Sequence, residues 1–139
     1  MAEYLFLYGT LQSGHAPAAI ASTAARLRPT GEGHVHGTLY DFGHYPGAIL
    51  DVSTQRKIFG AIYELPDDPS VLRQLDDYEE LDPDAPELGQ YLRVVHPVTL
   101  STGETMNCWI YIYNRDPGSA RIVESGRWGA ELRAKNPVT

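Results

Sequence analysis

The sequence predicts an α+β protein whose sheet is strongly curved or closed. Its 139 residues are enough for one domain with a proper core. Short runs of strand-forming residues outnumber the two short helical segments, and the two kinds do not alternate regularly as they do in doubly wound proteins. We therefore expect a single domain over residues 1–139. The one cysteine, Cys108, excludes an intramolecular disulfide.

The N-terminal third begins with an apolar run. Residues 4–8 predict a buried strand, because they are continuous and rich in strand-forming side chains. The glycines of residues 9–14 end this strand, and the alanine-rich residues 15–25 predict a helix. Residues 33–41 then predict a pair of strands, which a loop over residues 41–47 follows.

The middle of the chain predicts two strands and the start of a helix. The strands cover residues 47–52 and 57–65, around a turn at residues 53–56. Asp67 or Asp68 then provides the N-cap of the helix, because aspartate accepts hydrogen bonds from the first backbone N–H groups.

The C-terminal half predicts two long strands. Residues 81–89 contain two prolines and form a loop, and residues 91–100 form a strand in which Pro97 indicates a bulge or an edge. Residues 105–113 form the second strand, whose side chains alternate between two faces. One face is apolar core, and the other either lines a pocket or packs on a helix. The first holds Met106, Cys108, Ile110 and Ile112, and the second holds Asn107, Trp109, Tyr111 and Tyr113.

The charge distribution narrows the possible partners. A net charge of −7 makes nucleic acid and anionic membranes poor partners. Residues 64–87 hold ten acidic side chains and one arginine, a net charge of −9 that leaves +2 on the rest of the chain. Such a segment is usually a solvated face. The apolar run at residues 4–8 is too short for a signal peptide or a membrane span, so we expect a cytoplasmic protein.

No metal or cofactor site is expected. His34 and His36 share one face of a strand, but no third ligand follows at a suitable spacing. Cys108 lies among apolar residues and is expected to be inert core. Ser13 lacks the histidine and aspartate partners of a serine triad.

Glu79 lies on the apolar side of a helix predicted over residues 68–80. At about 100° per residue, this helix places Glu79 between Leu72 and Leu75, whereas Asp77 falls well outside the apolar stripe. An inward carboxylate is desolvated, and neighbouring acids act in the same direction, so its pKa rises. Glutamate in that state is a suitable general acid or base near neutral pH. The alternative is a glutamate at a frayed helix end that points to solvent.

The turn at residues 9–14 has the setting of an anion-binding loop. A strand precedes it and a helix follows, so its backbone N–H groups can hold a carboxylate or an oxyanion. It lacks the lysine and the GK[ST] ending of a nucleotide-binding loop. The alternative is a plain strand-to-helix turn.

Five motifs, taken in order, resemble the γ-glutamylcyclotransferase-like family, which includes γ-glutamylamine cyclotransferases and AIG2-like proteins. The resemblance covers nearly the whole chain, and the combined order is more specific than any single motif. It implies a small mixed β-barrel flanked by short helices, in agreement with the class predicted above. The motifs are YGTL at residues 8–11 followed by Gly14, YP at 45–46, LDDYE at 75–79, YLR at 91–93 and WIYIY at 109–113.

The resemblance implies an enzyme that cyclises a small γ-glutamyl substrate to 5-oxoproline and releases an amine or amino acid, without a metal or cofactor. It implies that Glu79 is the general acid/base, because Glu79 occupies the glutamate of the family's LDxxE motif. The family often has glycine next, whereas Glu80 here raises the pKa of Glu79 further or disfavours an anionic leaving group. The implied substrate-binding residues are Tyr8, Gly9, Thr10, Leu11, Tyr45, Tyr91 and Tyr113.

Three other functions are open on the sequence alone. A protein of this fold could bind a γ-glutamyl or other amino-acid-like ligand without turnover. A hydrolase could use Asp76 and Glu79 as paired carboxylates, since residues three apart share one side of a helix. The third is a purely structural partner domain. If the protein is a cyclotransferase, we expect its selectivity for the leaving group to come from residues 41–47, residues 81–89 and the tail.

Overall fold

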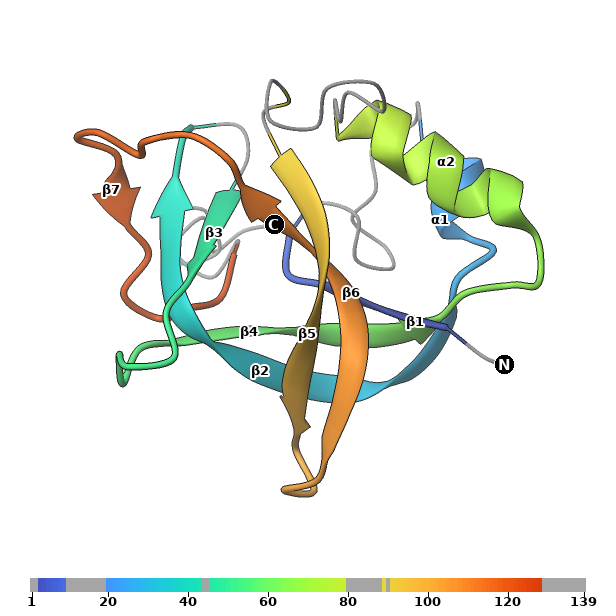
Figure 1. Cartoon of the computed structure of the whole chain (residues 1–139), viewed down its shortest axis with the longest axis horizontal. Coiled ribbons are helices and arrows are strands. Elements are labelled where there is room, and N and C mark those ends of the chain that lie inside the picture. Colours follow the sequence, from blue (N-terminus) through green and yellow to red (C-terminus); the bar gives the residue numbers. More distant parts are fainter. Residues whose placement is uncertain (1–2, 10–19, 44–45, 80–88, 90, 129–139) are drawn as a thin grey trace, which may run out of the picture.

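The computed structural model describes residues 3–9, 20–43, 46–79, 89 and 91–128 (Figure 1). Within these residues, no helix is long and apolar enough to cross a membrane. The helices of the described part are α1 (Ala21–Ala24) and α2 (Pro69–Tyr78). Its strands are β1 (Tyr4–Leu7), β2 (Arg28–Asp41), β3 (Pro46–Leu50), β4 (Lys57–Glu64), β5 (Tyr91–Leu100), β6 (Thr105–Tyr113) and β7 (Arg121–Ile122).

Five of these strands close into a mixed barrel. Neighbouring strands pair in the order β2, β4, β1, β6 and β5, and β5 pairs back onto β2 at Gly33 and His34. β1 and β6 run parallel, whereas the other barrel pairs are antiparallel. β3 and β7 pair with the last part of β2, outside this closed ring. The predicted α+β class and the small mixed β-barrel flanked by short helices are confirmed (Figure 1).

The prediction of a strand pair over residues 33–41 is wrong, because these residues belong to the single long strand β2. Gly33 and Gly37 look like turn signals, but here they allow close approach of neighbouring backbones. A Cβ at Gly33 would lie 2.6 Å from the carbonyl oxygen of Thr99. One at Gly37 would lie 2.4 Å from the carbonyl oxygen of Ile49. At both positions, glycine lets a neighbouring strand lie close to β2, so β2 continues without a turn.

The strand bounds near the site lie within two residues of the predicted ones. β5 and β6 have the predicted bounds, whereas β1 and β4 each end one residue before the predicted end, and β3 covers residues 46–50 instead of 47–52. Pro97 pairs with Asn107 in an unbroken register, so it lies on a strand edge and forms no bulge. The described part of the helix predicted over residues 15–25 contains α1.

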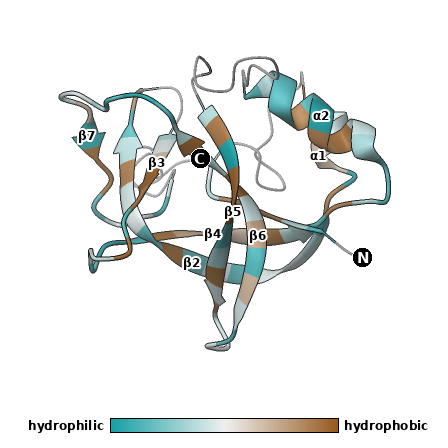
Figure 2. Ribbon diagram, in the orientation of Figure 1, coloured by the Kyte–Doolittle hydropathy of each residue, from teal (hydrophilic) through white to brown (hydrophobic). Residues whose placement is uncertain are grey.

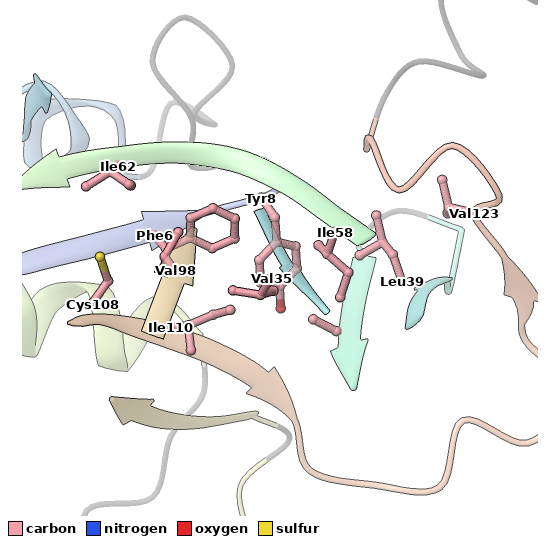
Figure 3. Close-up of a cluster of buried hydrophobic side chains, with 11 residues drawn as sticks. Phe6, Tyr8, Val35, Leu39, Ile58, Ile62, Val98, Cys108, Ile110 and Val123 are labelled. Atoms are coloured by element: carbon pink, nitrogen blue, oxygen red, sulfur yellow. The ribbon is translucent and has the colours of Figure 1, made fainter. Parts of the chain in front are cut away.

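The two faces of β6 pack on two separate cores. Cys108 and Ile110 point into the barrel, where all five barrel strands contribute side chains (Figure 3). Tyr111 on the opposite face is buried in a second core together with residues of α2, and Trp109 and Tyr113 pack against it. Brown and paler residues alternate along the strands in Figure 2, as this two-sided arrangement requires. The barrel core contains Phe6, Tyr8, Val35, Leu39, Ala48, Ile58, Ile62, Val98, Cys108, Ile110 and Val123.

Helix α2 begins at the predicted cap. Asp68 is the N-cap, and its carboxylate accepts a hydrogen bond of 2.9 Å from the backbone N–H of Ser70. Val71 and Leu75 are buried in the second core, as the apolar stripe predicts. The helix ends at Tyr78, two residues before the predicted end.

Candidate active site

The end of α2 leads directly into Glu79, the predicted general acid/base. Glu79 follows the last helical residue, and its backbone N–H still bonds the Leu75 carbonyl at 2.9 Å, so helical spacing continues to it. Its side chain is half-buried. Burial raises the pKa of Tyr8 and of Tyr111, and the negative charge of Glu79 adds to the rise at both phenol groups. The Glu79 carboxylate therefore acts electrostatically on both tyrosines, and its inward direction and its role as general acid/base stay predictions.

Tyr8 is buried directly after β1, and its hydroxyl group has fixed partners. It donates a hydrogen bond of 2.5 Å to the backbone carbonyl of Tyr111 and accepts one from the backbone N–H of Ala48. Burial raises the pKa of Tyr8 well above its ordinary value, the charge of Glu79 adds to this, and the Ala48 bond opposes it. The Tyr8 hydroxyl is therefore protonated at neutral pH.

Asp76, one helical turn before Glu79, receives three hydrogen bonds. Arg93 of β5 donates from Nε to Oδ1 at 2.7 Å and from Nη2 to Oδ2 at 3.0 Å. The Tyr111 hydroxyl donates to Oδ1 at 2.7 Å. The Arg93 guanidinium also lies over the ring of Trp109, 4.3 Å from its centroid. Because both oxygens of Asp76 are occupied, the arrangement disfavours a hydrolase that uses Asp76 and Glu79 as paired carboxylates.

Two other predicted tyrosines lie opposite each other where β5 begins and β6 ends. Tyr91 is buried and donates a hydrogen bond of 2.6 Å to the backbone carbonyl of Pro46, so its hydroxyl serves the fold. Tyr113 meets Tyr91 edge to face at a centroid distance of 5.7 Å and stacks on Phe42 at 4.4 Å. These rings form an aromatic side of the site next to the start of β3.

Gly9 is the last described residue before the predicted anion-binding turn. A Cβ at Gly9 would lie 2.8 Å from Cγ of Pro46, so a larger residue would displace the start of β3. Several predicted features lie outside the described residues, and their roles stay predictions. These are Thr10, Leu11, Tyr45, Glu80, the rest of the turn at residues 9–14 and most of the loop at residues 81–89.

The candidate residues lie in or directly after four elements, which are β1, α2, β5 and β6. In Figure 1, the start of β5, the end of β6 and the yellow-green end of α2 lie toward the same end of the molecule, as does β3, which supplies the contact residue Pro46. The hydrogen bonds of Tyr8, Asp76 and Tyr91 link these elements. The structure therefore brings together Glu79, Tyr8, Gly9, Tyr91 and Tyr113 from the predicted set.

Two other candidates from the sequence have ordinary structural explanations. Cys108 is buried in the barrel core, and this burial raises the pKa of its thiol to about 11, which makes it a poor nucleophile at neutral pH. His34 has a lowered pKa because of burial and the nearby charges of Lys57 and His36. Among the described residues, no group of three or more His, Cys, Asp or Glu side chains could hold a metal ion.

A groove of about 550 Å³ lies beside the start of α2, away from Glu79. Its walls carry both charges, and Arg28 pairs with Glu64 across 3.7 Å. Of the predicted catalytic and substrate-binding residues that the structure describes, none lines this groove. Its lining residues are Glu3, Arg26, Arg28, Glu64, Leu65, Pro66 and Asp67.

Sequence reasoning did not assign roles to Arg93, Phe42 or the Tyr111 hydroxyl. Arg93 stands in the YLR motif, but its partner Asp76 is 17 residues away, and only the docking of α2 on β5 joins them. Phe42 lies in the predicted loop at residues 41–47. Its aromatic side chain in a glycine-containing loop is the sequence signal that could have marked it as a site residue.

The closed mixed barrel with two short helices defines the fold class of the protein, and the family comparison agrees with it. Residues 5–130 match the family model described as "Gamma-glutamyl cyclotransferase, AIG2-like". This match covers most of the chain, so the protein belongs to that family. The resemblance seen in the sequence motifs is confirmed.

Relatives support the same assignment. The "Gamma-glutamylcyclotransferase family protein ytfP" of Citrobacter rodentium is 27% identical over 125 residues, which cover 89% of this chain and 93% of that protein. The crystal structure of an AIG2-like protein from Mus musculus has a TM-score of 0.68 at 23% identity, covering 89% of this chain and 87% of that one. The solution structure of YtfP from Escherichia coli has a TM-score of 0.62 at 23% identity, with 93% and 98% covered. The two structures share the fold of this chain.

Proposed function

We propose that this protein is a γ-glutamyl cyclotransferase that acts in the cytoplasm as a single domain over residues 1–139. Its substrate is a small γ-glutamyl compound, and its products are 5-oxoproline and a free amine or amino acid. The reaction is an intramolecular aminolysis, because the substrate carries its own nucleophile, the α-amine. It requires no metal, cofactor or attacking water.

Glu79 is the general acid/base of this reaction. Its carboxylate takes a proton from the α-ammonium group, and the free amine then attacks the γ-carbonyl carbon to form the ring C–N bond. The protonated Glu79 next gives its proton to the leaving nitrogen as the original amide C–N bond breaks. After the attack the ring nitrogen still carries two hydrogens, and Glu79 passes the second of these protons to the released amine, which departs as an ammonium group. The two protons lost by the α-nitrogen are thus gained by the leaving nitrogen, and the enzyme emerges unchanged.

Substrate positioning is the second part of the mechanism. The turn that starts at Gly9 supplies backbone N–H groups to the α-carboxylate or to the developing oxyanion. Thr10 and Leu11 belong to this turn, and Tyr45, Tyr91 and Tyr113 provide the surrounding aromatic contacts. Holding the glutamyl head in a folded conformation contributes through proximity, which supplies much of the rate in well-oriented intramolecular reactions.

The observation that carries the proposal is the half-buried position of Glu79 directly after α2, from which its charge acts on Tyr8 and Tyr111. The Tyr8 hydroxyl donates a hydrogen bond of 2.5 Å to the backbone carbonyl of Tyr111 and so joins the end of β1 to β6. This arrangement supports a carboxylate that reaches a glutamyl head held at the predicted turn. A γ-glutamyl binding protein without turnover requires no half-buried carboxylate at this position.

The proposal is tested with a panel of γ-glutamyl compounds in which 5-oxoproline is measured by mass spectrometry. The panel contains γ-glutamyl amino acids, γ-glutamylamines, an ε-(γ-glutamyl)lysine isopeptide and glutathione. We expect 5-oxoproline from at least one compound and no solvent oxygen in it when the reaction is run in ¹⁸O-labelled water. Glutamate labelled with ¹⁸O would indicate a hydrolase, and saturable binding without any product would indicate a binding protein.

A further inference from the structure

The last turn of α2 is held against the barrel by a network centred on Asp76. Its carboxylate accepts two hydrogen bonds from Arg93 and one from Tyr111, at 2.7 to 3.0 Å. The side chains of Asp76 and Arg93 are each 20% exposed, so solvent screens this ion pair only in part. Trp109 covers the guanidinium plane of Arg93 and fixes its orientation.

Tyr111 joins this network to the candidate catalytic residues. Its hydroxyl donates to Asp76, and its backbone carbonyl accepts from the hydroxyl of Tyr8. The hydrogen bonds therefore run from Asp76 through Tyr111 to Tyr8, and the charge of Glu79, three residues after Asp76, acts on both tyrosines.

A second consequence of the network is electrostatic. Residues three apart on a helix lie about 5–6 Å apart at their Cβ atoms, so an uncompensated charge on Asp76 would act strongly on Glu79. Arg93 supplies the compensating positive charge at hydrogen-bonding distance from both Asp76 oxygens. Arg93 thus removes a repulsion that would otherwise disfavour the charged form of Glu79.

We propose that Arg93 is a positioning residue for Glu79 that acts through Asp76, holding the last turn of α2 on β5 and β6 and neutralising the Asp76 charge. The inference rests on the proposed function for the catalytic role of Glu79. Arg93 touches neither the reacting atoms nor Glu79 in this scheme. Its contribution is to set the place and the proton affinity of the general base.

Several charged or titratable groups surround Glu79, and the test accounts for each of them. Tyr8 directly follows β1 and Tyr111 belongs to β6, and the raised pKa values of these two tyrosines keep both neutral at working pH. Asp76 and the exposed Asp77 belong to α2 itself, and Arg93 comes from β5. Of these, Asp76 and Arg93 can be changed separately to alter the net charge beside Glu79 in opposite directions.

Two variants test the inference through the titration of Glu79. In Arg93→Gln the charge of Asp76 is uncompensated, so the midpoint of Glu79 should rise by about one pH unit. In Asp76→Asn the charge of Arg93 is uncompensated, so the midpoint should fall by a similar amount. The titration is followed by NMR of ¹³C-labelled glutamate side chains, and the Glu79 signal is assigned by its loss in Glu79→Gln. Shifts of opposite sign support the inference, because a merely structural role would not produce them.

Turnover provides a second readout. Both variants should lower kcat for 5-oxoproline release about tenfold with little change in KM, because they displace or retune the base without touching the glutamyl head. The matched control is Arg26→Ala, which removes the ion pair of 2.8 Å between Arg26 and Asp68 at the other end of the same helix. It should leave the Glu79 midpoint and kcat within about twofold of the wild type, since this pair is exposed.

The inference is overturned if folded Arg93→Gln retains the wild-type midpoint, or if both variants shift it in the same direction. If Arg93→Gln does not fold, the variants Asp76→Asn and the charge-conserving Arg93→Lys test the role of Arg93 in its place. Arg93→Lys should keep the midpoint but lower kcat, because it loses the two-point contact. A wild-type chain that forms no 5-oxoproline overturns the proposed function instead, and the titration still decides the role of Arg93.

Discussion

The two ends of α2 are each tied to the rest of the protein by an Arg–Asp pair, but in very different surroundings. At the start of the helix, Arg26 contacts Asp68 at 2.8 Å with side chains that are 49% and 36% exposed. At its end, Arg93 makes two bonds to Asp76, Tyr111 adds a third, and both charged side chains are 20% exposed. The same pair of residue types therefore makes one solvated contact at one end and a fixed network at the other.

This difference shows at which end the position of the helix is fixed more closely. The N-terminal pair supplements a cap that Asp68 already provides through Ser70. The C-terminal network instead fixes the turn that carries Glu79 and connects it to Tyr8 through Tyr111. A partly desolvated, multiply bonded pair constrains geometry, whereas an exposed pair contributes little to stability and is screened by salt.

The largest expected effect comes from removing the apolar contact that seats the whole helix. Leu75 is fully buried in the second core, so Leu75→Ala should lower the free energy of unfolding by about 2–5 kcal/mol. Urea denaturation measures this change, and Leu72→Ala, at a half-buried position on the same helix, is the control that should cost less. A near-zero effect of Leu75→Ala would show that α2 is held by its polar ends and not by its apolar stripe.

A smaller effect is expected from the hydroxyl that completes the network at the C-terminal end of α2. Tyr111→Phe removes a hydrogen bond to a charged acceptor in a buried site, which should cost about 1.5–3 kcal/mol. A double-mutant cycle with Asp76→Asn measures how much of this loss depends on the carboxylate. Strictly additive effects of the two changes would contradict the direct contact, because neighbours in one network are coupled.

The smallest expected effect is a difference in alkaline stability between the two ends. Tyr8 and Tyr111 near the end of α2 have pKa values raised mainly by burial, so the folded chain keeps protons that the unfolded chain releases above about pH 10. The stabilisation that these two groups contribute is therefore fully present below that pH. Above it, the free energy of unfolding falls by about 1.4 kcal/mol per pH unit for each such group.

Replacing one of these tyrosines should flatten this pH dependence. Between pH 8 and pH 11, the free energy of unfolding should fall by about 1 kcal/mol less in Tyr8→Phe than in the wild type. Urea midpoints at a series of pH values give the two slopes. Equal slopes for Tyr8→Phe and the wild type would mean that the Tyr8 hydroxyl ionises as easily in the folded chain as in the unfolded one.

Local signals were sufficient for the bounds of β5 and β6 and for the apolar side of α2. The alternation along β6 separates Cys108 and Ile110 from Tyr111, and helical spacing places Val71 and Leu75 together in the second core. These features depend on residues close together in the chain, where the period of the secondary structure determines which side chains share a face.

Features that depend on distant segments were not predictable in the same way. The bond from Tyr111 to Asp76 joins residues 35 apart, and that from Tyr8 to the Tyr111 carbonyl joins residues 103 apart. The continuity of β2 through Gly33 was missed for a related reason, since the neighbour that requires glycine is Thr99 on β5. The closure of the barrel creates the contact at Gly33, the pairing of β1 with β6 brings Tyr8 to Tyr111, and the docking of α2 on β6 joins Asp76 to Tyr111. No short window of sequence contains any of these contacts.

The central claim is tested most directly by comparing two acids on the same turn of the chain. Glu79 is half-buried and its charge acts on Tyr8, whereas Asp77 is exposed. Glu79→Gln should keep the circular dichroism spectrum and the melting temperature of the wild type while lowering the rate of 5-oxoproline formation at least about a hundredfold. Asp77→Asn should retain nearly the full rate. A Glu79→Gln variant that still cyclises the substrate at the wild-type rate would contradict the assignment of Glu79 as the general acid/base.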